Sequence, residues 1–376
     1  MRYYGRKGIN LNTRKINLNQ LMILMVMFLI GGSTLANVGR YVGQNIWIVL
    51  LCGSFLGSIL FTIHYRISKL HQHKGLPDIL RDCFGKWFGS FLMIVYSGYF
   101  FFRTILLGNG MSEMASQTLM LGTPHRLIAL MLLITVIVGS LYGLNVVGRS
   151  SEIFFFITLI ALIPFFDAFF SREIFKYQNL MPLLENGITG IQRDVFRVFL
   201  FPYGDLVIFL MFFQFISKKQ RQNILKRSYI AIAIATLLMI TINTITVAIL
   251  GSSLVQNLAH PFYNAMELAA GNNFLDRIDS LAVIIVVVTT YFKLVLYFYT
   301  TILMIQSLSK KFNFKWVLWL NALVIFIVSP YIRLNQPDVL LNTIPFKVLP
   351  IFNLVIPILI WIISEIKYRK RKLPSK

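Results

Sequence analysis

Two cations, Arg103 and Lys293, lie within strongly apolar stretches of the sequence, and Asp205 lies where another apolar stretch is interrupted. A charge at membrane depth costs at least about 2.5 kcal/mol on insertion scales. Such a side chain therefore faces the interior of a helix bundle, reaches the membrane surface, or pairs with an opposite charge. Lys293 is central in its stretch, whereas Asp205 could pair with an arginine in a nearby loop.

Asp205 belongs to FPYGDL, residues 201–206, where a proline and a glycine interrupt an apolar run. A second interruption, GGST, occupies residues 31–34. Proline removes an amide donor and glycine permits unusual dihedral angles, so a helix unwinds there and exposes backbone groups that lipid cannot satisfy. Positive half-helix ends suit a carboxylate and exposed carbonyls suit a cation, so an amino acid could satisfy both. An ordinary kink or a loop end would explain either interruption alone.

Helical spacing places further side chains beside two of the charges. One face of the third apolar stretch combines Tyr99, Phe102, Arg103 and Leu106, and one face of the eighth combines Thr290, Lys293, Leu294 and Tyr297. The ammonium of Lys293 could fill the place where sodium-coupled carriers hold a cation, while Arg103 could instead be a structural partner or reach the membrane surface. Aromatic side chains on such faces are more often packing residues than ligand contacts.

The candidate ligand-binding site joins these two faces to the two interruptions, in each of which backbone geometry and side chains could both contribute. Its residues are Gly31, Gly32, Ser33, Thr34, Tyr99, Phe102, Arg103, Tyr203, Gly204, Asp205, Leu206, Thr290, Lys293, Leu294 and Tyr297. Within it, we expect backbone groups at Gly204 to hold the charged end of a ligand and Leu206 to contact its side chain.

No enzyme motif accompanies these residues. The sequence lacks the G-x-x-x-x-G-K-[ST] loop, the H-E-x-x-H pair and the G-x-S-x-G elbow. His71 and His73 lie on a basic connection, which we expect to be a solvated loop, because two ligands without a third do not make a zinc site. Cys52 and Cys83 provide neither a disulfide framework nor a C-x-x-C pair. We therefore expect no catalysis, no metal and no cofactor.

Composition identifies the solvent that surrounds these elements. Of the 376 residues, 57% are hydrophobic and 13% are charged, compared with about 45–50% and about 25% in soluble domains. A helix needs about 20 mostly apolar residues to cross the hydrocarbon layer. Ten stretches qualify: 17–36, 45–64, 88–107, 126–144, 151–170, 199–217, 228–250, 278–305, 316–333 and 347–364. The sequence therefore predicts an all-α integral membrane protein with about ten transmembrane helices.

The net charge of +22 is explained by its distribution along the chain. When the ten spans alternate from a cytoplasmic N-terminus, most lysines and arginines fall on the cytoplasmic side, as the positive-inside rule requires. Both termini are then cytoplasmic, and nucleic-acid binding is unnecessary to explain the charge. The basic N-terminus with the apolar run LMILMVMFLI also resembles a signal peptide, but its removal would leave the first half one helix short.

The ten spans divide into two halves of five, and each half begins with an interrupted span. Long connections at 65–87 and 251–277 separate the second and third spans of each half. An odd number of spans gives the halves opposite topology, and paired interruptions indicate an inverted-repeat transporter. We expect a basic N-terminal segment (1–16), one permease domain (17–364) and a basic cytoplasmic tail (365–376). The permease domain contains repeat one (17–170), a linker (171–198) and repeat two (199–364).

Three segments carry a resemblance to a known family. They are NLNQLMILMVMFLIGG, LMPLLENGITGIQRDVFRVFLFPYGDL and LDRIDSLAVIIVVVTTYFKLVLYFYTT. In order and spacing the chain resembles the B-subunit permeases of Ger-type spore germinant receptors, which belong to the amino acid, polyamine and organocation transporter superfamily. The PLLENG linker followed by FPYGDL is the most specific part of this resemblance.

The resemblance implies a protein of the spore inner membrane that senses a nutrient, such as an amino acid, together with A-type and C-type receptor subunits. The residues by themselves indicate only a transporter-like architecture. A proton-coupled amino acid transporter and a structural membrane scaffold for receptor subunits are the alternative functions. The nutrient and the receptor stoichiometry stay open.

Overall fold

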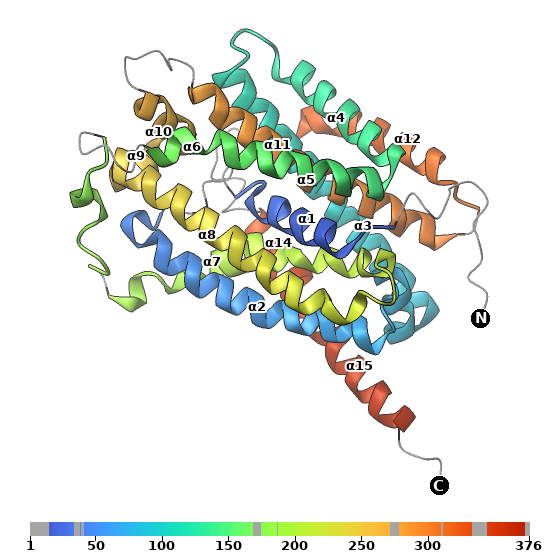
Figure 1. Cartoon of the computed structure of the whole chain (residues 1–376). Coiled ribbons are helices and arrows are strands. Elements are labelled where there is room, and N and C mark those ends of the chain that lie inside the picture. The colour runs from blue at the N-terminus through green and yellow to red at the C-terminus, as the bar shows by residue number, and fades with distance from the viewer. Residues whose placement is uncertain are drawn as a thin grey trace.

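The computed structural model describes residues 15–33, 38, 41–167, 174–185, 187–270, 278–309, 311–332 and 344–372 (Figure 1). Regular structure in these residues is helical, apart from an isolated parallel bridge between Ile16 and Ile216. The helices are α1 (Leu18–Ile30), α2 (Ile46–Leu70), α3 (Leu76–Thr118), α4 (His125–Tyr142), α5 (Leu144–Ala161), α6 (Ile163–Asp167), α7 (Gln192–Val198), α8 (Ile224–Leu250), α9 (Ser252–Asn257), α10 (Pro261–Ala270), α11 (Ile278–Leu308), α12 (Phe314–Val328), α14 (Ile344–Pro350) and α15 (Ile356–Lys372).

Eight helical segments of the described chain are long and apolar enough to cross a membrane. They are Gly43–Leu70, Leu76–Thr118, His125–Tyr142, Leu144–Asp167, Arg221–Leu250, Ser280–Leu308, Phe314–Tyr331 and Lys347–Tyr368. The other two predicted spans, 17–36 and 199–217, are those that contain the interruptions. The all-helical membrane fold is thus confirmed, while the count of ten spans and the inverted repeat stay predictions.

The first interruption ends α1 after only 13 residues. At its start, the amide of Gln20 donates to the side chain of Asn17 at 2.7 Å, and the Gln20 side chain accepts from the Asn17 amide at 3.1 Å. This reciprocal cap fixes where the helix begins. At its end, Gly31 has an extended backbone and Gly32 has a φ of +82°, a left-handed conformation that favours glycine. The chain therefore leaves the helix axis at the predicted position.

The second interruption changes helix type twice within one segment. After α7 the chain forms a π-helical turn at Phe199–Tyr203, and 3-10 helix follows at Gly204–Met211 and Phe213–Phe215. Inside the π turn Phe201 has an extended backbone, with φ −144° and ψ 118°. Pro202 cannot donate a backbone hydrogen bond, which explains why regular α-helix does not continue through the segment.

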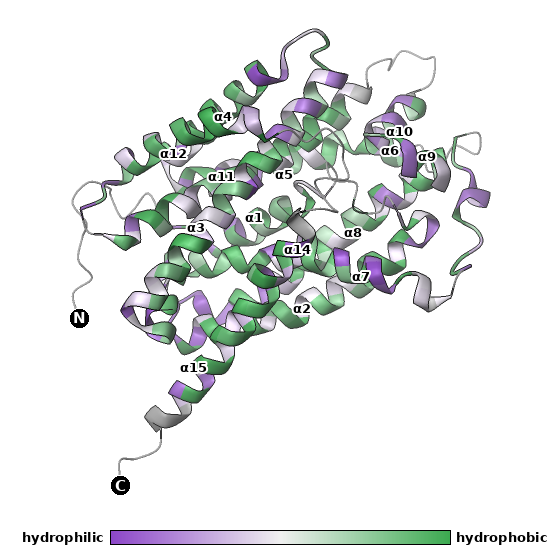
Figure 2. Cartoon of the chain, turned by 180° about the vertical axis from the view of Figure 1, so that it is seen from behind, coloured by the Kyte–Doolittle hydropathy of each residue, from purple (hydrophilic) through white to green (hydrophobic). Residues whose placement is uncertain are grey.

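The broken segments lie inside the bundle. Helix α1 packs against α5, α8 and α11, and α11 runs along α3. Figure 1 shows α1 near the middle of the molecule, with α4 and α12 on one flank and α2 and α8 toward the other. Figure 2 shows apolar residues along the long helices and hydrophilic residues near many helix ends and loops. Large side chains such as Phe156 and Trp319 point outward, as expected for helices that face lipid.

Two predicted connections differ from expectation. The first, 65–87, is mostly helical, because α2 continues to Leu70 and α3 begins at Leu76. Within α3, Gly85 has a φ of +81° and separates a short entry helix from the longer apolar part. The second connection, 251–277, contains α9 and α10, and its last part lies outside the described residues.

The prediction of a solvated loop at His71 and His73 is wrong. Both side chains are half-buried in the turn between α2 and α3. A ring nitrogen of His73 lies 2.9 Å from the hydroxyl of Ser68, and one of His71 lies 2.9 Å from the hydroxyl of Ser364 in α15. His71 is therefore held by the C-terminal helix and His73 by the end of α2, and the contact of His71 with a helix so distant in sequence could not be predicted from spacing.

Candidate functional site

Asp205 is the centre of a buried polar cluster. Its carboxylate is essentially inaccessible, with 1% of the residue exposed. Oδ2 accepts hydrogen bonds from Nη2 of Arg103 at 2.6 Å and from the Tyr297 hydroxyl at 2.6 Å. Oδ1 accepts from Nδ2 of Asn353 at 2.9 Å and from the Tyr99 hydroxyl at 3.3 Å. Four donors from three other helical segments therefore satisfy a charge that burial alone would make very costly.

Two cations surround this single carboxylate. Nη2 of Arg103 lies 2.6 Å and Nζ of Lys293 lies 3.2 Å from Oδ2 of Asp205, and all three side chains are buried. Nζ also lies over the rings of Phe28 and Phe201, at 4.5 Å and 4.3 Å from their centroids. The rings attract the ammonium but cannot neutralise it. Counted over these ionisable groups, the cluster carries one excess positive charge.

Several buried donors, in the cluster or on α11 three residues before Lys293, form no hydrogen bond. Within the described part of the chain, Nζ of Lys293, Nε of Arg103 and the hydroxyl of Thr290 are buried without a hydrogen-bond partner. Lys293 thus approaches Asp205 closely enough for an ion pair, but in a geometry that does not form a hydrogen bond. Buried polar groups normally have partners, so donors without partners beside an excess positive charge favour an acceptor that carries negative charge.

The glycines of the two interruptions permit close approach around the cluster. A Cβ at Gly32 would lie 3.1 Å from Leu107 and 3.6 Å from the side chains of Lys293 and Phe201. A Cβ at Gly31 would collide with the backbone of Thr289 in α11. At Gly204 a Cβ would lie 3.0 Å from Cβ of Asn353. Gly204 therefore lets the last helix approach, and its role as a holder of the charged end of a ligand stays a prediction.

Some predicted site residues lie outside the cluster. The hydroxyl of Tyr203 lies 2.7 Å from that of Thr236, so this side chain faces α8. Leu294 lines a separate cavity against α3 and α4. The hydroxyl of Ser33 donates to the carbonyls of Leu29 and Ile30, so this side chain satisfies backbone groups in the last turn of α1.

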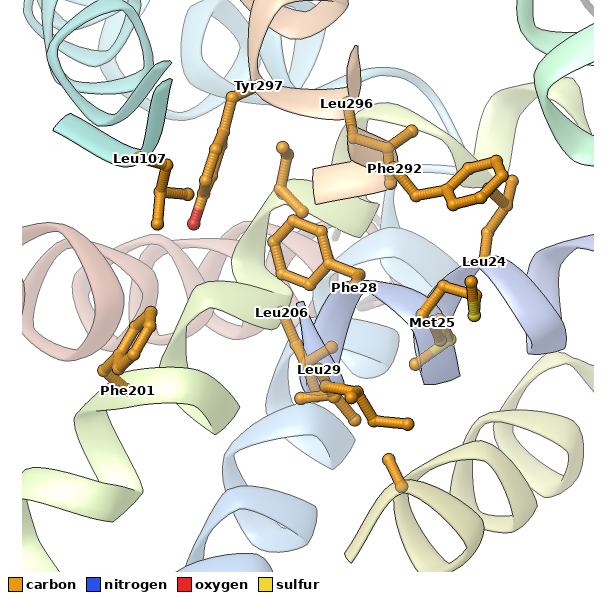
Figure 3. Close-up of a cluster of buried hydrophobic side chains, with 14 of the residues drawn as sticks. Leu24, Met25, Phe28, Leu29, Leu107, Phe201, Leu206, Phe292, Leu296 and Tyr297 are labelled. Atoms are coloured by element: carbon orange, nitrogen blue, oxygen red, sulfur yellow. The ribbon is translucent and has the colours of Figure 1, made fainter. Parts of the chain in front are cut away.

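Three further predicted residues have different positions. Leu206 is fully buried in apolar packing, and Figure 3 shows it next to Phe28 and Leu29. Phe102 is half-buried, and among the described residues no hydrogen bond or ring contact joins it to the cluster. Thr34 lies outside the described residues.

Asn353 is a cluster residue that the sequence-based prediction missed. It is fully buried in a π-helical turn, Ile351–Val355, between α14 and α15. Its Nδ2 donates to the carbonyl of Leu200 at 3.1 Å as well as to Asp205, and its Oδ1 accepts from Tyr99 at 3.1 Å. The available signal was an asparagine in an otherwise apolar stretch, followed by a proline four residues later.

Known proteins are similar to this chain in sequence or in fold. A family model described as spore germination protein matches residues 15–337. Spore germination protein KB of Bacillus subtilis (strain 168) is 27% identical over 366 residues, covering 95% of this chain and 96% of that protein. Spore germination protein YndE of the same strain is 26% identical over 372 residues, covering 96% of this chain and 98% of that protein.

A solved transporter structure has a similar fold. It is Mhp1, a nucleobase-cation-symport-1 family transporter in a closed conformation, with a TM-score of 0.63 and 14% sequence identity. The match covers 89% of this chain and 75% of the Mhp1 chain. At this identity the likeness concerns the fold, and it agrees with the transporter-like architecture inferred from the broken helices. Because the family model spans most of the sequence, from before α1 to beyond α12, this chain belongs to the spore germination protein family of membrane permeases.

Proposed function

We propose that this chain is the membrane-embedded, ligand-binding subunit of a spore germinant receptor. Membership of the spore germination family supports a role in germination, and the helical transporter fold supports a ligand site in the bundle interior. In this proposal the protein lies in the spore inner membrane with both termini in the cytoplasm, and A-type and C-type receptor subunits are its partners.

The ligand is a small nutrient that carries a carboxylate, with an amino acid as the leading class. The observation that carries this step is the excess positive charge around Asp205, together with the unused donors of Lys293, Arg103 and Thr290. A ligand carboxylate near Lys293 would neutralise the excess charge and accept from these donors. The ammonium group of the amino acid would be attracted by the carboxylate of Asp205.

Binding at this position would act on several helices at once. The cluster joins α3 through Arg103, the 3-10 segment through Asp205, α11 through Lys293 and the last helix through Asn353. A carboxylate that competes with Asp205 for the cations would change the relative free energy of helix arrangements. We propose that this rearrangement is what the partner subunits detect.

A proton-coupled amino acid transporter is the second candidate. The likeness of the fold to that of a symporter supports it. For a transporter, the ammonium of Lys293 would occupy the place of a bound coupling cation. The two functions use the same proposed binding site and differ in whether the ligand crosses the membrane.

The deciding experiment uses spores that lack only this chain, complemented with the parent gene, together with vesicles that contain the purified chain. Germination and uptake are measured for a panel of amino acids and for the corresponding amino acid amides, which retain the ammonium but lack the carboxylate. A response to the amino acids that is lost with the amides, without uptake, supports the receptor. Uptake by the isolated chain supports the transporter, and equal responses to acid and amide would contradict the carboxylate site.

A further inference from the structure

A cavity lies apart from the charged cluster, between α3, α4 and α12. Its volume is about 610 Å³, within the range of roughly 300–1,000 Å³ typical of small-molecule sites. The side chains of Arg103, Asp205 and Lys293 do not line it, although their neighbours Thr104 and Leu294 do. The cavity is therefore distinct from the charged cluster, and a ligand bound at the cluster would not fill it.

The cavity is polar at one end and apolar along its depth. His125 and Arg126, at the start of α4, line the polar end and are both exposed. Val136 lines the deep end and is buried. Position 136 lies eleven helical steps beyond position 125, which corresponds to roughly 16 Å, about half of the roughly 30 Å hydrocarbon thickness. The cavity thus runs from the membrane surface toward the midplane, as one acyl chain of a single leaflet does.

Its outer wall faces lipid. Phe326 and Ile327 of α12 line the cavity while remaining 51% and 54% exposed. On the neighbouring surface of α4, Met131 and Ile134 are also exposed. A lipid could therefore enter sideways from the bilayer, without passing through the bundle.

The charges at the mouth favour an anionic headgroup. Glu113 interacts electrostatically with His125, so His125 is not a free partner for an anion and the attraction must come from Arg126. Within the described residues, Arg126 forms no ion pair or hydrogen bond. Asn109 also lines the cavity, but its side-chain amide already donates to the carbonyls of Ser329 and Ile332 at 2.9 Å and 2.8 Å. Arg126 is thus the group available to a phosphate.

We propose that this cavity binds one anionic phospholipid, with its phosphate at Arg126 and an acyl chain along the apolar wall toward Val136. In the topology proposed above, the lipid belongs to the extracytoplasmic leaflet. The site is separate from the nutrient site, but both share α3 and α11, so the lipid would hold these two helices in their present packing.

The chain offers matched variants for a test. Arg126→Gln removes the cation, and Arg193→Gln is its control, because Arg193 is exposed at the start of α7 and does not line the cavity. Gly108→Phe fills the cavity, since a Cβ at Gly108 meets only Leu294 at 4.0 Å. Gly98→Phe is its control on the same helix, where a Cβ meets nothing within 4 Å.

The measurement is the thermal stability of the full-length protein in detergent, titrated with phosphatidylglycerol, phosphatidylcholine or glycerol phosphate. We expect phosphatidylglycerol to raise the Tm of the parent and of both controls at lower concentrations than phosphatidylcholine, and glycerol phosphate to have no effect. Arg126→Gln should weaken the phosphatidylglycerol effect about fivefold, the factor for one basic side chain near an anionic lipid surface. Gly108→Phe should abolish it. A parent-like titration of Arg126→Gln, or equal stabilisation by glycerol phosphate, would overturn the proposal.

Discussion

Nη2 of Arg103 and Oδ2 of Asp205 lie 2.6 Å apart, although 102 positions separate the two residues in the chain. Both side chains are almost fully buried, with side-chain exposures of 3% and 0%. The pair joins α3 to the 3-10 segment that follows the proline break. A buried pair of this kind adds little to the free energy of unfolding compared with well-packed apolar side chains. The removal of one partner is nevertheless costly, because the other charge stays buried without a counter-ion.

Asp205→Asn should therefore destabilise the protein by about 3–5 kcal/mol, because two buried cations lose their counter-ion. The measurement is the Tm and the yield of the full chain in detergent. Asp82→Asn is the control, since Asp82 pairs with Lys74 at 2.7 Å while the two side chains are 42% and 38% exposed, and about 0–1 kcal/mol is expected for such a surface pair. Adding Arg103→Gln to Asp205→Asn should restore part of the lost stability. A double variant less stable than the single variant would argue against the pairing.

Lys293→Met keeps the length of the side chain but removes its charge. Since Asp205 retains Arg103, we expect the protein to reach the membrane in parent-like amounts, while nutrient sensitivity falls by at least tenfold because a ligand carboxylate loses its ammonium partner. The assay is the nutrient concentration for half-maximal germination, compared with protein content by immunoblot. The parent response should also be the same in sodium and potassium buffers. A parent-like dose response in Lys293→Met would assign the lysine a purely structural role.

Gly32 and Gly85 form a matched pair for separating backbone strain from obstruction. Their φ values are +82° and +81°, so alanine is strained at both, by about 1 kcal/mol. At Gly32 the new Cβ would lie 3.1 Å from Leu107 and 3.6 Å from the side chain of Lys293, whereas at Gly85 nothing lies within 4 Å. Gly32→Ala should reduce nutrient sensitivity and Gly32→Leu should abolish it. Gly85→Ala should lower only the Tm, and a similar loss of response in that variant would contradict obstruction at Gly32.

Leu206→Ala tests whether this buried residue contacts the ligand side chain. Direct contact predicts a shift of preference toward larger amino acids by roughly 1–3 kcal/mol. Leu210→Ala, at an equally buried position of the same segment, is the control for loss of packing, which costs about 2–5 kcal/mol of stability. The readout is half-maximal germination over amino acids of increasing size. An equal loss of response for all sizes, with less protein in the membrane, would make Leu206 a packing residue.

The turn between α2 and α3 predicts a pH dependence of stability. Burial, followed by the nearby charges of Arg221 and Lys69, lowers the pKa of His73 from 6.5 to about 4. Between these values the unfolded chain binds a proton that the folded protein does not bind, so stability is fully present above about pH 6.5 and is lost as pH falls toward 4. Burial also lowers the pKa of His260 to about 4, with the same sign.

His73→Gln should accordingly flatten part of the decrease in Tm between pH 6.5 and pH 4, and a double variant with His260→Gln should flatten more of it. The measurement is a series of thermal unfolding scans at fixed ionic strength. A decrease as steep in the double variant as in the parent would assign the pH dependence to other groups.

The broken helices could be predicted from the sequence because their cause is local. Glycines at positions 31 and 32, and proline with glycine at 202 and 204, limit backbone geometry regardless of what surrounds them. The sequence also predicted correctly that Tyr99 shares a helix face with Arg103, and that Lys293 shares one with Tyr297. Side chains four residues apart on a regular helix share a face, and in the structure all four residues meet at Asp205.

Tertiary packing decided which faces meet and what lies between them. Asn353 enters the cluster only because Gly204 allows the last helix to approach, a contact between residues 149 positions apart that no spacing rule contains. The direction of the Tyr203 side chain could not be predicted from the sequence either. Through Phe199–Met211 the chain changes from π to 3-10 geometry, so the rotation per residue departs from that of an α-helix and the predicted face does not persist. The sequence by itself therefore determined where the helices break and which charges enter the membrane, while the packing of helices distant in sequence determined that two cations share one carboxylate.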